Sequence, residues 1–86
     1  MMNKQEFSNL VQTVTNAFRC GHEGRANTLL VEVFDQMLPL CNQVSAQDMQ
    51  FIQSVMPILA DAQQRGDMIY LSDILQYEVL PRIMNS

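Results

Sequence analysis

The sequence predicts an all-α protein, a four-helix bundle built from two similar helical hairpins. Four stretches place apolar residues at the three- and four-residue spacing of one helix face, and no useful stretch alternates between apolar and polar residues as a strand does. Glycine and proline residues separate these stretches. The loops should therefore be short, and consecutive helices should pack as antiparallel neighbours.

The two hairpins, residues 3–44 and 45–86, are expected to be copies of one unit. A shift of 42 residues aligns Asn3 with Ser45, Gly24 with Gly66 and Pro39 with Pro81 without an insertion. Repeats of about 40 residues are typical of helix pairs that must stack to bury their apolar faces. The alternative is a chance agreement between amphipathic helices. At 86 residues, the whole chain (1–86) should form a single domain.

The first helix should run from about Lys4 to Cys20. Asn3 and Glu6 have the spacing of a capping box, and Gly21 supplies the left-handed residue that ends the helix. Its predicted inner face consists of Phe7, Leu10, Val11, Val14, Ala17 and Phe18. Its predicted polar face consists of Gln5, Ser8, Asn9, Gln12 and Asn16.

The second helix should start near Gly24 to Arg25, and Pro39 should kink or end it because proline removes one helical hydrogen bond. Its predicted inner face consists of Ala26, Leu29, Leu30, Val33, Met37 and Cys41.

The third helix should begin after Ser45, with Asp48 repeating the capping box, and should end at Gly66. Pro57 lies inside it and predicts a kink. Its predicted core residues are Met49, Ile52, Met56, Leu59 and Ala60.

Asp67 should cap the fourth helix, which should end at Pro81. Its predicted inner stripe is Met68, Leu71, Leu75 and Val79.

Nine acidic and five basic residues give the chain a net charge of -4, and the basic residues are scattered. Nucleic acid is a disfavoured partner, because binding phosphates needs a clustered basic footprint. A basic protein partner fits the charge better.

The start of the chain lacks the pattern of a secretory signal. No apolar stretch is long enough to span a membrane, which takes about 18 residues. We expect no membrane association and a cytoplasmic protein, in which Cys20 and Cys41 are buried or half-buried thiols.

The sequence contains no convincing catalytic set, so we expect a protein that is not an enzyme. His22 is the only histidine, and Cys20, His22 and Glu23 lack the second ligand pair of a zinc site. No glycine-rich loop could hold a phosphate. We therefore expect neither a metal nor a cofactor.

The fourth helix carries an unusual polar and aromatic face. Tyr70, Asp73 and Tyr77 fall together, about half a turn from the inner stripe. Tyrosine offers a large contact area with a polar tip, which suits a protein interface. Phe51 and Ile58 likewise lie opposite the core stripe of the third helix. These residues should form a partner-binding surface, unless the proline kinks turn them into the core of the monomer.

The segment from Asp67 to Pro81 resembles a helix found in small helical proteins and domains of bacteria, and the pair Tyr77 and Glu78 before Leu80 and Pro81 is its most specific part. Glu78 is also among the predicted partner-binding residues. The whole chain, short, acidic and helical, is also similar to immunity proteins that neutralise secreted bacterial toxins. That resemblance implies binding to a toxin and no catalysis.

These observations favour a non-enzymatic protein-binding module, an immunity or antitoxin protein that neutralises a cognate, basic, nuclease-type bacterial toxin. The alternative is a homodimeric chaperone or adaptor for secretion or assembly, which would bind a secreted client and dimerise through Phe51 and Ile58.

Overall fold

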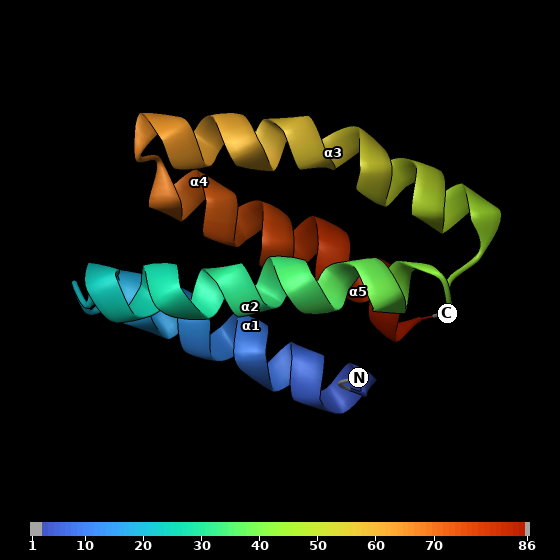
Figure 1. Ribbon diagram of the computed structural model, residues 1–86, viewed down its shortest axis with the longest axis horizontal. Helices are drawn as coiled ribbons and strands as arrows, with labels where there is room; N and C mark the ends of the chain where they lie inside the picture. Colours follow the sequence, from blue (N-terminus) through green and yellow to red (C-terminus); the bar gives the residue numbers. More distant parts are fainter. Residues whose placement is uncertain (1–2, 86) are drawn as a thin grey trace.

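The computed structural model describes residues 3–85, and it confirms an all-α bundle. Three long helices, α1 (Lys4–Arg19), α2 (Glu23–Cys41) and α3 (Ala46–Arg65), precede α4 (Met68–Asp73), the π-helix η1 (Ile74–Val79) and α5 (Leu80–Met84). The last three elements follow one another without a break, and we call them together the C-terminal rod (Figure 1). The ends of the predicted domain, residues 1–2 and 86, lie outside the described residues.

Asn3, Ser45 and Asp67 cap their helices as predicted, but only one of the two predicted capping boxes is complete. Asn3 Oδ1 accepts from the backbone N–H of Glu6 at 2.8 Å, and the Glu6 carboxylate accepts from that of Asn3, so the first capping box is complete. Ser45 Oγ accepts from the N–H of Asp48 at 3.1 Å, and Asp67 Oδ1 accepts from that of Tyr70. The second capping box is only half formed, because the Asp48 carboxylate bonds to Arg82 instead.

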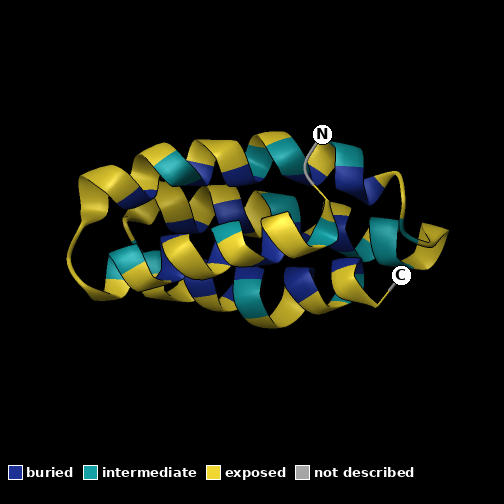
Figure 2. Ribbon diagram, turned by 90° about the horizontal axis from the view of Figure 1, so that it is seen from below, coloured by how far each residue is buried: buried dark blue, intermediate teal, exposed yellow. Residues whose placement is uncertain are grey.

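The buried core lies between the helices, and the exposed residues face outward (Figure 2). Its largest fully buried side chains include Phe7, Leu30, Leu59, Leu71 and Ile83. Among the described residues predicted to lie inward, Ala60 is exposed, whereas Leu10, Ala17, Phe18, Leu29, Met49, Met56 and Met68 are half-buried. Burial of the nearby Val55 and Ala62 moves the core face of α3 away from Ala60.

Ser8 was predicted on the polar face of the first helix but is buried. It lies on α1, which packs against both α2 and the C-terminal rod. A helix with neighbours on two sides buries a wider arc than one apolar stripe, which explains the burial of Ser8 and of Thr15.

The predicted helix end at Pro81 is wrong, because the chain continues through Pro81 to Met84. The π-helix before it is the reason. The N–H of Leu80 donates to the carbonyl of Leu75, five residues back, which widens the turn just ahead of the proline. Likewise α2 continues past Pro39 to Cys41, and α3 continues past Pro57 with the bend visible in Figure 1.

The structure does not confirm the internal repeat. The glycines with positive φ that follow α1 and α3 are Gly21 (φ 80°) and Gly66 (φ 73°), whereas the repeat pairs Gly66 with Gly24, which lies inside α2. The π-helix of the second hairpin also has no counterpart among the elements of the first. Both halves end a helix at a glycine, but these glycines do not keep the predicted 42-residue offset.

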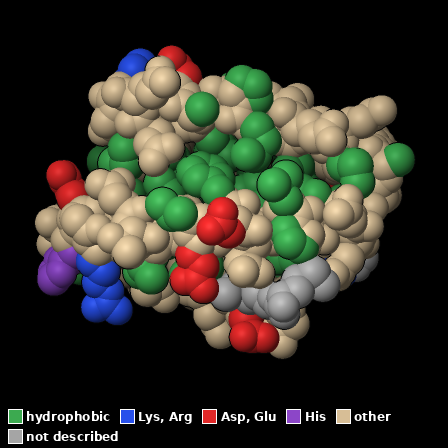
Figure 3. Space-filling view, viewed as in Figure 1, with side chains coloured by type: hydrophobic (Ala, Val, Ile, Leu, Met, Phe, Trp, Pro, Cys, Tyr) green, Lys and Arg blue, Asp and Glu red, His purple; other side chains and the backbone are tan. Residues whose placement is uncertain are grey.

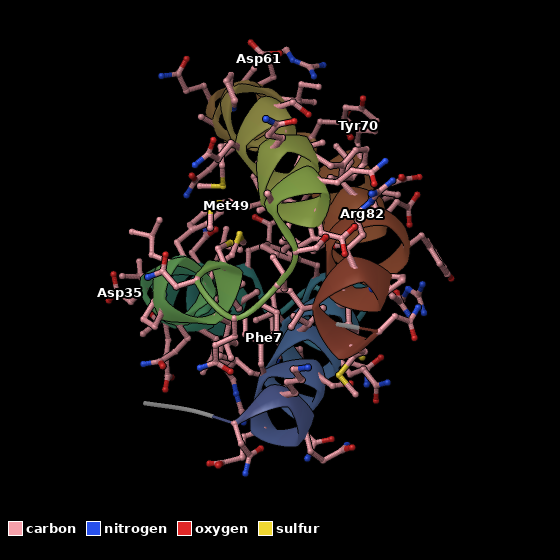
Figure 4. The ribbon with its side chains drawn as sticks, turned by 90° about the vertical axis from the view of Figure 1, so that its right-hand side faces the viewer. Phe7, Asp35, Met49, Asp61, Tyr70 and Arg82 are labelled. Carbon is pink, nitrogen blue, oxygen red and sulfur yellow. The ribbon has the colours of Figure 1, made fainter. Side chains whose placement is uncertain are left out.

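The three long helices and the C-terminal rod pack unequally around the core. Seen along their length in Figure 4, α1 and α3 lie opposite each other, with α2 on one side and the C-terminal rod on the other. α1 packs along both α2 and the C-terminal rod, whereas α2 and α3 approach each other at few positions. No helix in the described part of the chain is long and apolar enough to cross a membrane.

Candidate protein-binding face

The outer side of the C-terminal rod carries the predicted aromatic and acidic residues. Tyr70 is 43% exposed and Tyr77 is 61% exposed, and Asp73 and Glu78 are exposed beside them. Ile69, with 74% of its surface exposed, adds an apolar side chain to the same rod. We call Ile69, Tyr70, Asp73, Tyr77 and Glu78 together the tyrosine face. The alternative that proline kinks turn the tyrosines into the core is wrong.

The π-helix brings Glu78 to the surface. In a regular α-helix, Glu78 would follow the buried Leu71 by seven residues and Leu75 by three, and would share their buried side. The wider π turn instead buries Val79, four residues after Leu75, and leaves Glu78 exposed. The tyrosine face therefore depends on the irregular turn as much as on residue spacing.

The carboxylates of the tyrosine face have no basic partner within residues 3–85. Elsewhere Arg65 pairs with Asp61 at 2.8 Å and with Asp67 at 3.7 Å, and Arg82 pairs with Asp48 at 3.1 Å. Two of the five basic residues are thus already neutralised by acidic side chains of the chain. The carboxylates of Asp73 and Glu78 remain available to a basic partner.

Phe51 is engaged inside the chain. The Arg82 guanidinium lies 3.6 Å from the centroid of the Phe51 ring, while its Nη1 bonds to Asp48 Oδ1. This cation–π stack joins α3 to α5 and leaves Phe51 half-buried. Phe51, which was predicted for the partner-binding surface, therefore packs partly against the C-terminal rod and offers little free aromatic surface.

Ile58 on α3 is 41% exposed and remains open, as the interface prediction requires. Tyr77 and Glu78 join Asp48, Pro81, Arg82 and Asn85 around a shallow pocket of about 300 Å³. Figure 4 shows Tyr70 and Arg82 on the same side of the molecule, beside α3. The structure thus brings Tyr77 and Glu78 together with the Phe51–Arg82 stack, and it leaves Ile58 as a separate exposed residue of α3.

Two contributors to this region were absent from the predicted set. Ile69 precedes Asp73 by four residues and Tyr77 by eight, so its spacing already placed it on the outer side. Arg82 could not be found in this way, because its partners Asp48 and Phe51 lie in another helix and only the tertiary fold brings them together.

The described residues contain no cluster of three or more His, Cys, Asp or Glu side chains that could hold a metal ion. Cys20 and His22 line an open pocket of about 260 Å³ at the turn between α1 and α2. Cys20 is an exposed free thiol, contrary to the prediction, because α1 ends beside it, whereas Cys41 is buried and burial raises the pKa of its thiol.

Comparison with known proteins identifies a family for this chain but gives no function. No curated protein and no solved structure is significantly similar to the chain. Residues 2–86 match the family described as Domain of unknown function (DUF8042). Because the match spans almost the whole sequence, the chain belongs to that family.

Proposed function

We propose that this protein is a non-enzymatic binding module, an immunity or antitoxin protein that neutralises a cognate, basic, nuclease-type bacterial toxin through the tyrosine face. The observation that supports the proposal is the exposure of Tyr70 and Tyr77 on the same rod as Asp73 and Glu78, which have no ion pair with residues 3–85. A cytoplasmic location, where free thiols persist, is part of the proposal and agrees with the free Cys20 and Cys41.

In the proposed interface, the tyrosines and the carboxylates contribute to binding in different ways. Exposed tyrosines give large, rigid contact areas and are enriched among residues that dominate binding energy. Carboxylates around them mainly accelerate and orient the encounter with a positively charged protein. Both groups protrude from a helical rod that is fixed to the core by Leu71, Leu75 and Val79, so little backbone freedom is lost on binding.

A second candidate function is a homodimeric chaperone or adaptor for a secreted client. The exposed Ile58 on α3 favours it, because an apolar side chain on the outside of a helix gains by meeting a second copy. The Phe51–Arg82 stack reduces the apolar area for such a dimer. Concentration-dependent dimerisation that Ile58→Asp abolishes would support this second candidate.

The test begins with the protein that co-purifies with the tagged chain. Tyr77→Ala and Asp73→Lys should each weaken its binding by more than about 1 kcal/mol in calorimetry, with helicity unchanged because both residues are exposed. Asp73→Lys should also slow association, and more so at low salt.

Glu32→Lys is the matched control, since it makes the same charge change at an exposed position of α2. Equal loss of binding with Glu32→Lys would mean that only net charge matters, and the proposed face would be wrong. Binding unaffected by either change on the C-terminal rod would overturn the proposal.

A further inference from the structure

A second apolar surface lies between α2 and α3, on the side of α3 away from the tyrosine face. Figure 3 shows hydrophobic side chains gathered in a continuous strip over this seam, and Figure 4 shows Met49 on the α2 side of α3, with Tyr70 and Arg82 on its other side. We call this strip the α2/α3 groove. We assign to it the exposed or half-buried apolar side chains of the two helices, Val31, Phe34 and Leu38 of α2 and Met49 and Met56 of α3.

The groove exists because α2 has two apolar stripes and only one is covered. Its core stripe includes Val33 and Met37, both buried. Val31, Phe34 and Leu38 follow the three- and four-residue spacing of a second stripe, and 58% of Val31 and 67% of Leu38 stay exposed. Since α2 and α3 approach each other at few positions, the second stripe has no covering helix in the described chain.

The dimensions and side chains of the groove suit a helix. α3 has 20 residues, so the seam can accommodate a helix of about 30 Å. Half-buried Met49 and Met56 are flexible and polarisable, and they can adapt to the side chains of an incoming apolar stripe. An amphipathic helix laid into an apolar groove is a recurrent mode of protein recognition.

The charges around the groove select the kind of helix. Asp35 lies between Val31 and Leu38 along α2, and Glu23 lines the pocket at the end of the seam with Asn27 and Gln63. Neither carboxylate has an ion pair in residues 3–85. Figure 3 shows acidic side chains along the lower edge of the strip, and Lys or Arg side chains only towards its left-hand end.

These charges disfavour a second copy as the occupant. In a twofold dimer the same surface meets itself, so a second copy would bring the same carboxylates, Glu23 and Asp35, and the same net charge of -4. A partner with Lys or Arg beside its apolar stripe would instead meet complementary charge. We propose that the α2/α3 groove binds an amphipathic α-helix of another protein whose flanks are basic. This inference does not depend on the tyrosine face.

The test uses the full chain labelled at its methionine methyl groups and observed by NMR. The probe is a synthetic peptide of about 18 residues with leucines on one helix face and lysines on its flanks. Its controls are a scrambled peptide of the same composition and a leucine–glutamate counterpart. The Met49 and Met56 signals should shift with the leucine–lysine helix alone, whereas that of Met84, on α5, should not.

Leu38→Lys should weaken peptide binding about tenfold or more, because it places a positive charge on the apolar wall and repels the basic flanks. Gln12→Lys adds the same charge at an exposed position of α1 and should leave affinity unchanged. The absence of binding, or equal affinity for the scrambled or acidic peptide, would overturn the proposal. Shifts of Met49 and Met56 on concentrating the chain alone would identify a second copy as occupant, and shifts only with phosphatidylglycerol vesicles would identify lipid, so either result would also overturn it.

Discussion

Replacing Leu71 by alanine tests the assignment of the core most directly. Leu71 is fully buried at 0% exposure, in α4, which packs against both α1 and α3. Leucine-to-alanine changes at such positions cost about 2–5 kcal/mol, through lost burial and the cavity that remains. Because Leu71 is held between two neighbouring helices that cannot both collapse into the space, we expect about 3 kcal/mol.

The matched control is Ile69→Ala, two positions away in α4, where 74% of the side chain is exposed. It should change the free energy of unfolding by no more than about 0.5 kcal/mol. Urea unfolding followed by circular dichroism measures both, and for a domain of this size Leu71→Ala should also lower Tm by about 12–24 °C. Equal effects of the two changes would show that the buried side of the C-terminal rod is assigned wrongly.

Two further predictions concern the π-helix and the thiols. Deleting Gln76 should convert η1 to a regular α-helix but place Pro81 within it at a cost of about 3 kcal/mol. Adding Pro81→Ala should recover most of that cost in urea unfolding, and no recovery would mean that the proline does not explain the wide turn. Cys20 should react rapidly with a thiol reagent at neutral pH, whereas the buried Cys41, whose raised pKa leaves less thiolate, should react only in denaturant. Fast reaction of both in the native protein, followed by mass spectrometry, would contradict the burial of Cys41.

Local sequence was sufficient to predict the helices and most of their boundaries. Caps such as Asn3 and Ser45, and the left-handed Gly21 and Gly66, act within one turn of the chain, so their effect could be read directly. Spacing placed Tyr70 and Tyr77 away from the inner stripe, but only the structure excluded the alternative that the proline kinks turn them into the core.

Local rules failed where a distant helix competed for the same group. Asp48 was expected to complete a capping box, but Arg82 takes its carboxylate, and the same guanidinium covers Phe51. These three residues come from α3 and α5, which are far apart in sequence. No pattern within either helix indicates which of its side chains will meet the other.

The sequence by itself determined that this chain forms amphipathic helices, and it predicted that aromatic and acidic residues of the last helix lie away from the inner stripe. Tertiary packing decided where the regular helix gives way to a π turn. Leu71, Leu75, Val79 and Ile83 recur every four residues, and a regular α-helix would rotate such a row by about 40° at each step. Burying all four on one side of the rod requires a wider turn, and that turn exposes Glu78 while allowing Pro81 to continue the rod. Packing likewise decided that α2 and α3 stay apart, because each helix is held more closely by its other neighbour than by the seam that they share.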